Sequence, residues 1–423
     1  AVMGTPVRPC VRWGGRSGWA RPAYILRRKK RFGNFPPRRR ATVHDGAVPT
    51  PASPWTDLTG TQREIVLALL RSGRLPRTRL MEIVGISPGS VTRLTTPLIE
   101  AGLLTTSTER VAGTGRPQSP LELRAEAEHV LGLALSNRAV TAVLTDLRAD
   151  VVASSRVELP GHSPDAVLDA VAEAAAAVSD DVRPACAGLA LGGSTADGRV
   201  VEDAGFYGWH DVPLARLAEE RLGVPATIGN DLVALTGLEA WFGAGAAADR
   251  FALLTTGAGI GYGLVIGGEV VTSADAQLGL ISNVPVPDGD RPPHAAPAME
   301  CLTSAALERA WEAEGRERAT AHRVVELARE GDAAAVTVCA SFARRLGRLI
   351  GMVAALTLTE QVVVAGERAD LAALLEDQVM VGVSAVRRAS ARPLRVTVRE
   401  HDRVEWARGA AVLALRERVA GRL

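Results

Sequence analysis

Residues 230–261 constrain the fold of this chain more than any other stretch. An Asn-Asp pair at 230–231 opens a helical pattern rich in alanine and leucine. A strand pattern over 251–255 follows and runs into a turn with glycine at 257, 259 and 261, after which a second strand begins. Strand and helix patterns alternate from about residue 129 to the end of the chain, which predicts an α/β fold with helix-covered sheets.

Other segments of this region favour the same fold class. Strand patterns lie at 130–152 and 187–194, and helical patterns lie at 164–178 and 214–222. With 423 residues and 47% hydrophobic content, the chain has room for two or three domains with sizeable cores. We expect residues 127–423 to form the α/β part.

The charge is unevenly distributed along the chain. Residues 1–54 carry twelve Arg or Lys residues and one acid, Asp45, whereas the rest is net acidic and the total is only +2. Basic clusters such as 27–32 could bind phosphate backbones through counterion release. Gly, Pro and Arg without hydrophobic periodicity are more typical of a disordered chain, so we expect residues 1–54 to be a basic, disordered extension.

The cysteines and the hydropathy pattern suggest a cellular compartment. Four cysteines lie far apart, at positions 10, 186, 301 and 339, with no CxxC pair. This spacing argues against a disulfide framework and suits a reducing cytosol. No apolar run approaches the roughly 20 residues of a membrane span, and the N-terminus lacks a secretory pattern. The sequence therefore predicts a cytoplasmic protein that does not bind membranes.

Residues 55–126 show the pattern of a winged helix-turn-helix. A first helix from Thr59 ends near 72–73, and a second covers 77–84 before a glycine turn. Ser87 is placed to cap a third helix whose first residue is Pro88. Two short strands with a cationic tip at 113–117 complete the module. A helical hairpin for protein contacts is the alternative, but it accounts for neither the capped helix nor the tip.

The third helix is the expected reading helix. Its apolar positions leave small and cationic side chains exposed, which lets the helix approach base edges closely. Pro97 is expected to kink its end. The residues expected to contact DNA are Arg77, Thr78, Ser87, Gly89, Ser90, Thr92, Arg93 and Arg116.

The α/β part resembles the ROK family of repressors, open reading frames and sugar kinases over about 129–416. The motifs that carry the resemblance are the Asn-Asp helix, the glycine turn, Gly208-Trp209 and the terminal Gly-Ala-Ala-Val-Leu-Ala-Leu at 409–415. The winged helix looks like that of ROK repressors, which commonly carry a GxGRP wing. The resemblance implies a two-lobed, actin-like (ribonuclease H-like) sugar-kinase fold with a cleft between the lobes.

The resemblance also locates nucleotide-binding positions. In the family's kinases an Asp is the catalytic base, which places Asp231 at that position, and the turn with Gly257, Gly259 and Gly261 faces ATP phosphate. The family's first phosphate motif, Asp followed by Gly-Gly-Thr, aligns with Ala-Leu-Ser-Asn-Arg at 134–138. The acid and the glycines are absent, and bulky side chains would obstruct a phosphate. The turn at 365–368 is poorer in glycine than the family's adenosine motif. Since phosphoryl transfer needs these parts together, we expect no catalysis.

The sugar- and zinc-binding motifs are altered as well. Leu280 stands where the family has a sugar-binding Glu, Asn283 where it has a His that binds sugar and zinc, and Thr303 where it has another Glu. Of three zinc-binding cysteines only Cys301 remains, and one cysteine cannot hold a tetrahedral zinc ion. We expect neither a metal nor a cofactor. The residues that an effector would contact are Gly193, Asn230, Asp231, Leu280 and Asn283.

Two interpretations of Asp231 remain open. It either caps its own helix or contacts a ligand hydroxyl. The leading hypothesis is a sequence-specific, homodimeric transcription regulator that binds operator DNA and whose non-catalytic ROK-like part senses an effector or only dimerises. The alternative is an ATP-dependent ROK sugar kinase with an appended DNA-binding module. A third hypothesis is a ligand-blind regulator or scaffold.

Overall fold

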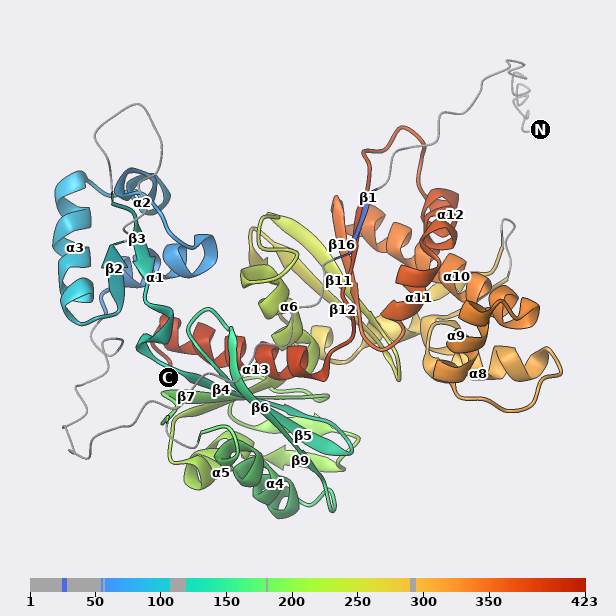
Figure 1. Ribbon diagram of the computed structural model, residues 1–423, viewed down its shortest axis with the longest axis horizontal. Helices are drawn as coiled ribbons and strands as arrows, with labels where there is room; N and C mark the ends of the chain where they lie inside the picture. Colours follow the sequence, from blue (N-terminus) through green and yellow to red (C-terminus); the bar gives the residue numbers. More distant parts are fainter. Residues whose placement is uncertain (1–24, 29–54, 56–57, 107–118, 180–181, 290–293) are drawn as a thin grey trace, which may run out of the picture.

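The computed structural model describes residues 25–28, 55, 58–106, 119–179, 182–289 and 294–423. Figure 1 shows a small helical module, a lobe built on a five-stranded sheet and a lobe built on a six-stranded sheet. The structure thus confirms the predicted order of a winged helix-turn-helix followed by a two-lobed α/β part. Within these described ranges, none of the helices combines the length and the apolar composition that crossing a bilayer requires.

The N-terminal module folds as a winged helix-turn-helix because its helix starts are capped. Thr59 and Gln62 form a capping box, and Ser87 accepts a hydrogen bond from the Ser90 amide. The third helix contains Pro97 and continues past it to Glu100. The elements are α1 (Gly60–Ser72), α2 (Arg77–Val84), α3 (Pro88–Glu100), β2 (Leu104–Thr106), β3 (Leu121–Leu123) and the 3-10 turn η1 (Ala125–Ala127).

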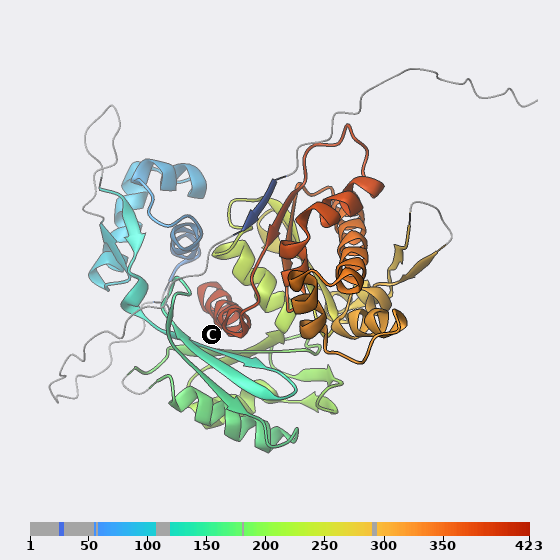
Figure 2. The same ribbon diagram turned by 45° about the vertical axis from the view of Figure 1, so that its right-hand side comes forward.

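The first lobe is a five-stranded sheet with helices on both faces. Its strands, in spatial order, are β10 (Ala226–Asn230), β7 (Cys186–Leu191), β4 (Val130–Leu135), β5 (Ala139–Thr145) and β6 (Val151–Glu158). One face packs against α4 (Pro164–Ala176) and α5 (Leu214–Leu222), and the other against α13 (Arg403–Ala420) (Figures 1 and 2). Glycines at 132 and 188 let α13 approach: a Cβ at Gly188 would lie 1.9 Å from the Ala410 carbonyl oxygen. A hairpin of β8 (Val201–Ala204) and β9 (Trp209–Val212) extends this lobe.

The second lobe is a mixed six-stranded sheet. Its strands, in spatial order, are β1 (Ile25–Arg28), β17 (Arg395–Val398), β16 (Gln361–Ala365), β11 (Arg250–Thr256), β12 (Ile260–Ile266) and β13 (Glu269–Val270). The helices of this lobe are α7 (Ala298–Cys301), α8 (Ser304–Ala313), α9 (Ala321–Glu330), α10 (Ala333–Thr357), α11 (Ala369–Leu374) and α12 (Glu376–Val386). Two 3-10 turns and a small hairpin complete it: η2 (Asp275–Gln277), η3 (Leu280–Asn283), β14 (Pro285–Pro287) and β15 (Ala295–Pro297).

Helix α6 (Asp231–Trp241) connects the two lobes. It packs against α13 on one side and against β12 on the other, so nearly all of its residues are buried. A Cβ at Gly263 of β12 would lie 2.0 Å from Thr236 Oγ1 of α6, so strand and helix are in direct contact. The Asn-Asp helix and the glycine-turn strand that the sequence singles out therefore form one packed unit between the lobes.

One segment departs from expectation. Residues 25–28, part of the stretch predicted to be disordered, form strand β1 and pair in parallel with β17 at the sheet edge. Parallel pairing supplies hydrogen bonds that the sequence pattern of this short segment did not indicate. The other residues of 1–54 lie outside the described residues. The wing tip with Arg116 lies outside them as well.

Candidate DNA-binding surface and interlobe site

The outward face of α3 is the candidate DNA-reading surface. Its buried residues are Val91, Thr95 and Leu98. This leaves Gly89, Thr92 and Arg93 exposed. The Arg93 guanidinium has no hydrogen bond or ion pair with any residue that the structure describes. Its donors are therefore available for a phosphate or a base edge.

Three other residues of the predicted contact set are engaged within the module. Ser87 Oγ lies 3.0 Å from Ser90 Oγ and accepts from the Ser90 amide at 3.3 Å, so both hydroxyls complete the start of α3. Arg77 Nη1 donates to the Ser119 carbonyl at 3.3 Å, which ties α2 to the base of the wing. Thr78 is exposed at the start of α2. In the free chain these contacts position the reading helix and the wing.

Sequence reasoning missed Thr96 on the same face. Thr96 is exposed, and its Oγ1 donates to the Thr92 carbonyl at 2.8 Å. Residues four apart on a helix lie one above the other, so its spacing from Thr92 is the signal that could have identified it.

The predicted effector residues of the first lobe meet where β7 and β10 end. The two strands are parallel neighbours, so their carboxyl ends lie at the same edge of the sheet. Asn230 Nδ2 donates to the Gly193 carbonyl at 3.0 Å, and its Oδ1 accepts from the amides of Leu232 and Val233. Asn230 therefore caps α6 and holds the turn after β7.

The two carboxylate oxygens of Asp231 have different surroundings. Oδ1 accepts from the Leu232 amide at 2.8 Å, whereas Oδ2 lies 3.8 Å from the point that a Cβ on Gly192 would occupy. Capping uses one oxygen, and no residue that the structure describes donates to the other, so the two interpretations of Asp231 are compatible. Desolvation by burial raises the pKa of Asp231, and the hydrogen bond from the Leu232 amide partly offsets this effect.

Phe206 is a candidate that sequence reasoning missed. It lies between β8 and β9 and is 70% exposed. Its ring atom Cδ2 is 3.8 Å from the same Cβ point above Gly192. An apolar ring and a carboxylate oxygen thus flank one glycine. The run Gly-Phe-Tyr-Gly-Trp at 205–209 could have indicated it, because it overlaps the Gly-Trp motif already noted.

The loop at the position of the first phosphate motif is closed on itself. The Ser136 amide donates to the Ala139 carbonyl at 3.0 Å, and the Ala139 amide donates to Ser136 Oγ at 3.1 Å. Tyr207 donates its hydroxyl to the Ser136 carbonyl, and His162 Nε2 donates to the Asn137 carbonyl, both at 2.7 Å. Two of the four amides at 136–139 are therefore bonded within the turn, which leaves fewer donors for a phosphate.

The glycine turn between β11 and β12 is partly covered by an acidic residue. Glu367 Cβ lies 3.2 Å from the point that a Cβ on Gly257 would occupy, and the Glu367 side chain is exposed. The Arg368 amide donates to the Thr256 carbonyl at 2.8 Å, which fixes this arrangement. A carboxylate beside the turn disfavours a polyphosphate there by like-charge repulsion.

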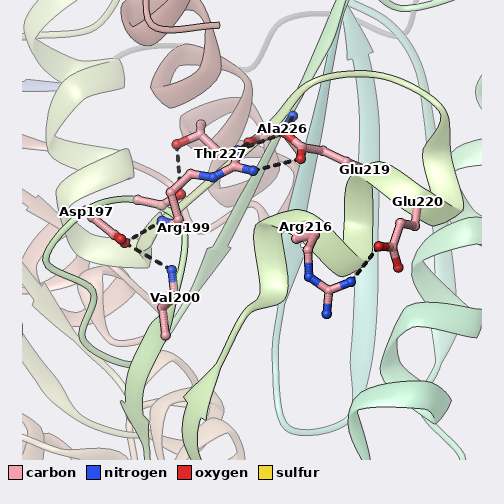
Figure 3. Close-up of polar contacts among 9 residues, drawn as sticks. Asp197, Arg199, Val200, Arg216, Glu219, Glu220, Ala226 and Thr227 are labelled. Atoms are coloured by element: carbon pink, nitrogen blue, oxygen red, sulfur yellow. Dashed lines mark hydrogen bonds and ion pairs between the residues drawn. The ribbon is translucent and has the colours of Figure 1, made fainter.

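Gln277 joins the two lobes. Its Oε1 accepts from the Thr195 amide and its Nε2 donates to the Thr195 carbonyl, both at 2.9 Å. The turn that carries Thr195 is itself held by an ion-pair network around Arg199 (Figure 3). Arg199 contacts Glu219 at 2.7 Å and the Ala226 carbonyl at 2.8 Å, and Asp197 Oδ1 accepts from the Arg199 amide at 2.7 Å.

The loop that Gln277 holds carries the remaining predicted effector residues. Leu278 is 57% exposed and Leu280 is 51% exposed, and Asn283 is exposed at the end of η3. Gln277 thus brings this loop beside the turn that follows Gly192 and Gly193. We call these residues together the interlobe site: Gly192, Gly193, Phe206, Asn230, Asp231, Gln277, Leu278, Leu280 and Asn283.

The residues at the family's zinc position do not fit a zinc ion. Cys301 is buried, its Sγ is 3.9 Å from the Ala296 carbonyl oxygen, and burial raises the pKa of its thiol to about 11. A zinc ligand has to be a thiolate. Throughout the part of the chain that the structure describes, no three His, Cys, Asp or Glu side chains lie close enough together to share a metal.

Comparison with known proteins places these features in a family. Residues 58–105 match the winged helix-turn-helix DNA-binding family. The DNA-binding transcriptional dual regulator NagC of Escherichia coli is 26% identical over 317 residues, which cover 70% of this chain and 77% of NagC.

Two solved structures share the fold. A ROK family transcriptional regulator homologous to the E. coli MLC protein aligns with a TM-score of 0.70 at 20% identity, covering 85% of this chain and 96% of that one. A ROK family glucokinase from Streptomyces griseus aligns with a TM-score of 0.57 at 22% identity, covering 67% and 98%. Residues 130–417, more than half of the chain, match the ROK family itself. The chain therefore belongs to the ROK family.

Proposed function

We propose that this chain is a sequence-specific, DNA-binding transcription regulator whose ROK part senses a ligand or dimerises instead of phosphorylating a sugar. The observation that carries the proposal is an Arg93 on the reading helix that has no partner among the described residues, together with a loop at 136–139 that is bonded within itself. The first supplies donors for DNA, and the second leaves fewer amides for the phosphate that phosphoryl transfer needs. The similarity to NagC and to a ROK regulator of known structure supports the same conclusion.

The proposed DNA contacts come from α3 and the wing. Three exposed residues of α3 approach base edges: Gly89, Thr92 and Arg93. Four others hold the helix against the sugar-phosphate backbone of the DNA: Arg77, Thr78, Ser87 and Ser90. Arg116 is a further proposed contact. As a homodimer, the chain would bind a two-fold operator whose half-sites lie about one or two helical turns apart.

The proposed effector has one polar anchor and an apolar face. Asp231 Oδ2 accepts a hydrogen bond from it, and Phe206 and Leu280 present hydrocarbon surface. A site with polar side chains for hydroxyls rejects ligands that lack the hydroxyls, because its buried polar groups would stay unpaired. Leu280 offers no such polar group, so the site should favour an apolar group at this position. We therefore expect a ligand less polar than a free hexose.

Two measurements test this proposal. Selection of duplexes from a random DNA library by the full chain should enrich a two-fold motif. A thermal-shift screen with sugars, sugar phosphates, nucleotides and apolar metabolites should find stabilisation by a ligand with few hydroxyls, since a ligand that binds only the folded state raises its stability. ATP-dependent phosphorylation of a hexose or amino sugar that disappears in Asp231→Asn would instead establish the kinase alternative.

A further inference from the structure

The DNA-binding module shares one buried apolar cluster with the ROK part, and three arginines add polar contacts at this junction. Arg63 of α1 donates Nη1 to the Val419 carbonyl at 3.2 Å. Arg418 of α13 lies over the Trp55 ring of the module, 5.9 Å from its centroid, and binds the carboxylate of Glu128, at the start of the ROK part, with Nε and Nη2 at 2.9 and 3.0 Å. Arg71, in the last turn of α1, donates Nη2 to the Gly268 carbonyl at 3.0 Å. These arginines meet the end of α13 and the turn between β12 and β13, and the module also contacts the turn between β5 and β6, where the Leu147 amide donates to the Ala125 carbonyl at 2.9 Å.

The turn between β12 and β13 carries a shared carboxylate. Glu269 Oε1 is 3.4 Å from Arg71 Nη1, and Glu269 Oε2 is 3.5 Å from Arg416 Nη2 of α13. One acid thus bridges a cation of the DNA-binding module and a cation of the ROK part. The Glu269 side chain is 60% exposed, so water and salt screen this cluster.

A packed path connects this cluster with the interlobe site. The guanidinium of Arg416 lies over the Trp241 ring, 5.8 Å from its centroid, and Trp241 ends the helix that Asp231 begins. The same helix is pressed onto β12 at Gly263, and β12 leads directly into the turn that holds Glu269. A ligand that shifts Asp231 therefore acts on α6 and β12. The C-terminal ends of both elements lie at the cluster.

The ion pairs at the junction of module and ROK part differ in how easily they break. The side chains of Arg418 and Glu128 are only 8% and 12% exposed. Breaking a buried ion pair strands a charge, whereas an exposed pair exchanges its partner for water at little cost. The Arg418 contact is suited to act as a pivot, and the Glu269 contact is the one that can open and close.

We propose that the Arg71–Glu269–Arg416 cluster is the contact through which the interlobe site sets the orientation of the DNA-binding module, with Arg418–Glu128 as the fixed pivot. The proposal rests on the proposed function. In the closed arrangement the module is preorganised, and this arrangement binds the operator. An effector that binds the closed and the open arrangement of the cluster with different affinities shifts the equilibrium between them. The ratio of these affinities limits how far it can change operator affinity.

The test is a double-mutant cycle in the full chain. The probe is a duplex selected from a random library by the wild-type protein, and binding is measured by fluorescence anisotropy at about 0.15 M salt. Glu269→Gln and Arg71→Gln should each weaken binding roughly three- to tenfold, and the double variant should be no weaker than the weaker single variant. Glu220→Gln removes an exposed ion pair with Arg216 on the first lobe (Figure 3) and should bind like the wild type.

Hydrogen exchange gives a second readout that needs no DNA. Glu269→Gln should speed amide exchange in 60–72 and in 266–270 without lowering the melting temperature. Effects that multiply in the double variant, wild-type or tighter operator binding by Glu269→Gln, or unchanged exchange would each overturn the proposal. If the wild type selects no duplex, the proposed function fails, and the exchange measurement still decides whether Glu269 holds the module.

Discussion

Arg418 and Glu128 stand 290 positions apart in the sequence and form a two-bond ion pair in which both side chains are almost buried. The Arg418 guanidinium also lies over the Trp55 ring, 5.9 Å from its centroid. Trp55 precedes the first helix of the DNA-binding module and Glu128 follows its last strand. One residue of the C-terminal helix therefore contacts the start of the module and the residues where the chain enters the ROK part.

Loss of this ion pair should destabilise the protein. Glu128→Gln removes the negative charge that two guanidinium nitrogens of Arg418 bind at a nearly buried position, and removing one partner of a buried ion pair typically costs about 3–5 kcal/mol. Thermal and urea denaturation should show a clear drop in stability. Glu220→Gln, whose partner Arg216 is exposed, should stay within about 0.5 kcal/mol of the wild type. Equal stabilities of the two variants would contradict a buried role for Arg418–Glu128.

Arg93→Ala should weaken operator binding without unfolding the module. The side chain is exposed and has no partner within the described residues, so its removal leaves no buried group unpaired. The expected loss is ~1–3 kcal/mol if Arg93 reads a base, with relaxed specificity at one position of the motif. Arg318→Ala removes an arginine that is 89% exposed on the second lobe and serves as the control. Equal binding by the two variants would remove Arg93 from the interface.

The winged helix could be predicted from the sequence because its signals are local. Ser87 and Pro88 mark the start of α3, and Gly85 supplies the left-handed residue after α2. The predicted bounds of α2 and α5 agree with the structure for the same reason. The docking of the module was not predictable, because Arg63, Arg71 and Arg418 look like ordinary surface charges until the fold brings their distant partners beside them.

Gln277 should control the order of the effector loop. Gln277→Ala removes both hydrogen bonds to Thr195 and should cost about 1–2 kcal/mol. Hydrogen exchange over residues 271–284 should accelerate, while the sheets exchange as before. Asp275→Asn, in the same 3-10 turn, is the matched control because its side chain is exposed. Unaltered exchange in Gln277→Ala would show that the loop is held by other contacts.

Asp231→Asn should change the pH dependence of stability. Because burial raises the pKa of Asp231 in the folded state, ionisation destabilises the fold, and this penalty grows as pH rises above the unfolded value of 3.8. The stability of the variant relative to the wild type should therefore increase as pH rises above about 4.

Asp197→Asn is a control of opposite sign. The amides of Arg199 and Val200 hold the pKa of Asp197 below its usual value, so its charge stabilises the fold. This variant should be less stable than the wild type at neutral pH, and the difference should shrink as pH falls toward 3.8 and below. A stability difference for Asp231→Asn that does not vary with pH would contradict the account of its burial.

The interlobe site was predicted only in part. Asn230, Asp231 and Gly193 could be placed together because they lie at or directly after the carboxyl ends of neighbouring parallel strands. Phe206 was missed because a single aromatic residue in a turn carries no periodic signal. Gln277 was missed for a different reason: its role depends on the backbone of Thr195, which is 82 positions away in sequence.

The most direct test of the central claim is to offer the full chain a random duplex library and, separately, ATP with common hexoses and amino sugars. The account predicts an enriched two-fold DNA motif whose binding is weakened in Arg93→Ala, and no phosphorylated sugar. The contradicting result is phosphorylation that disappears in Asp231→Asn together with no enriched DNA motif.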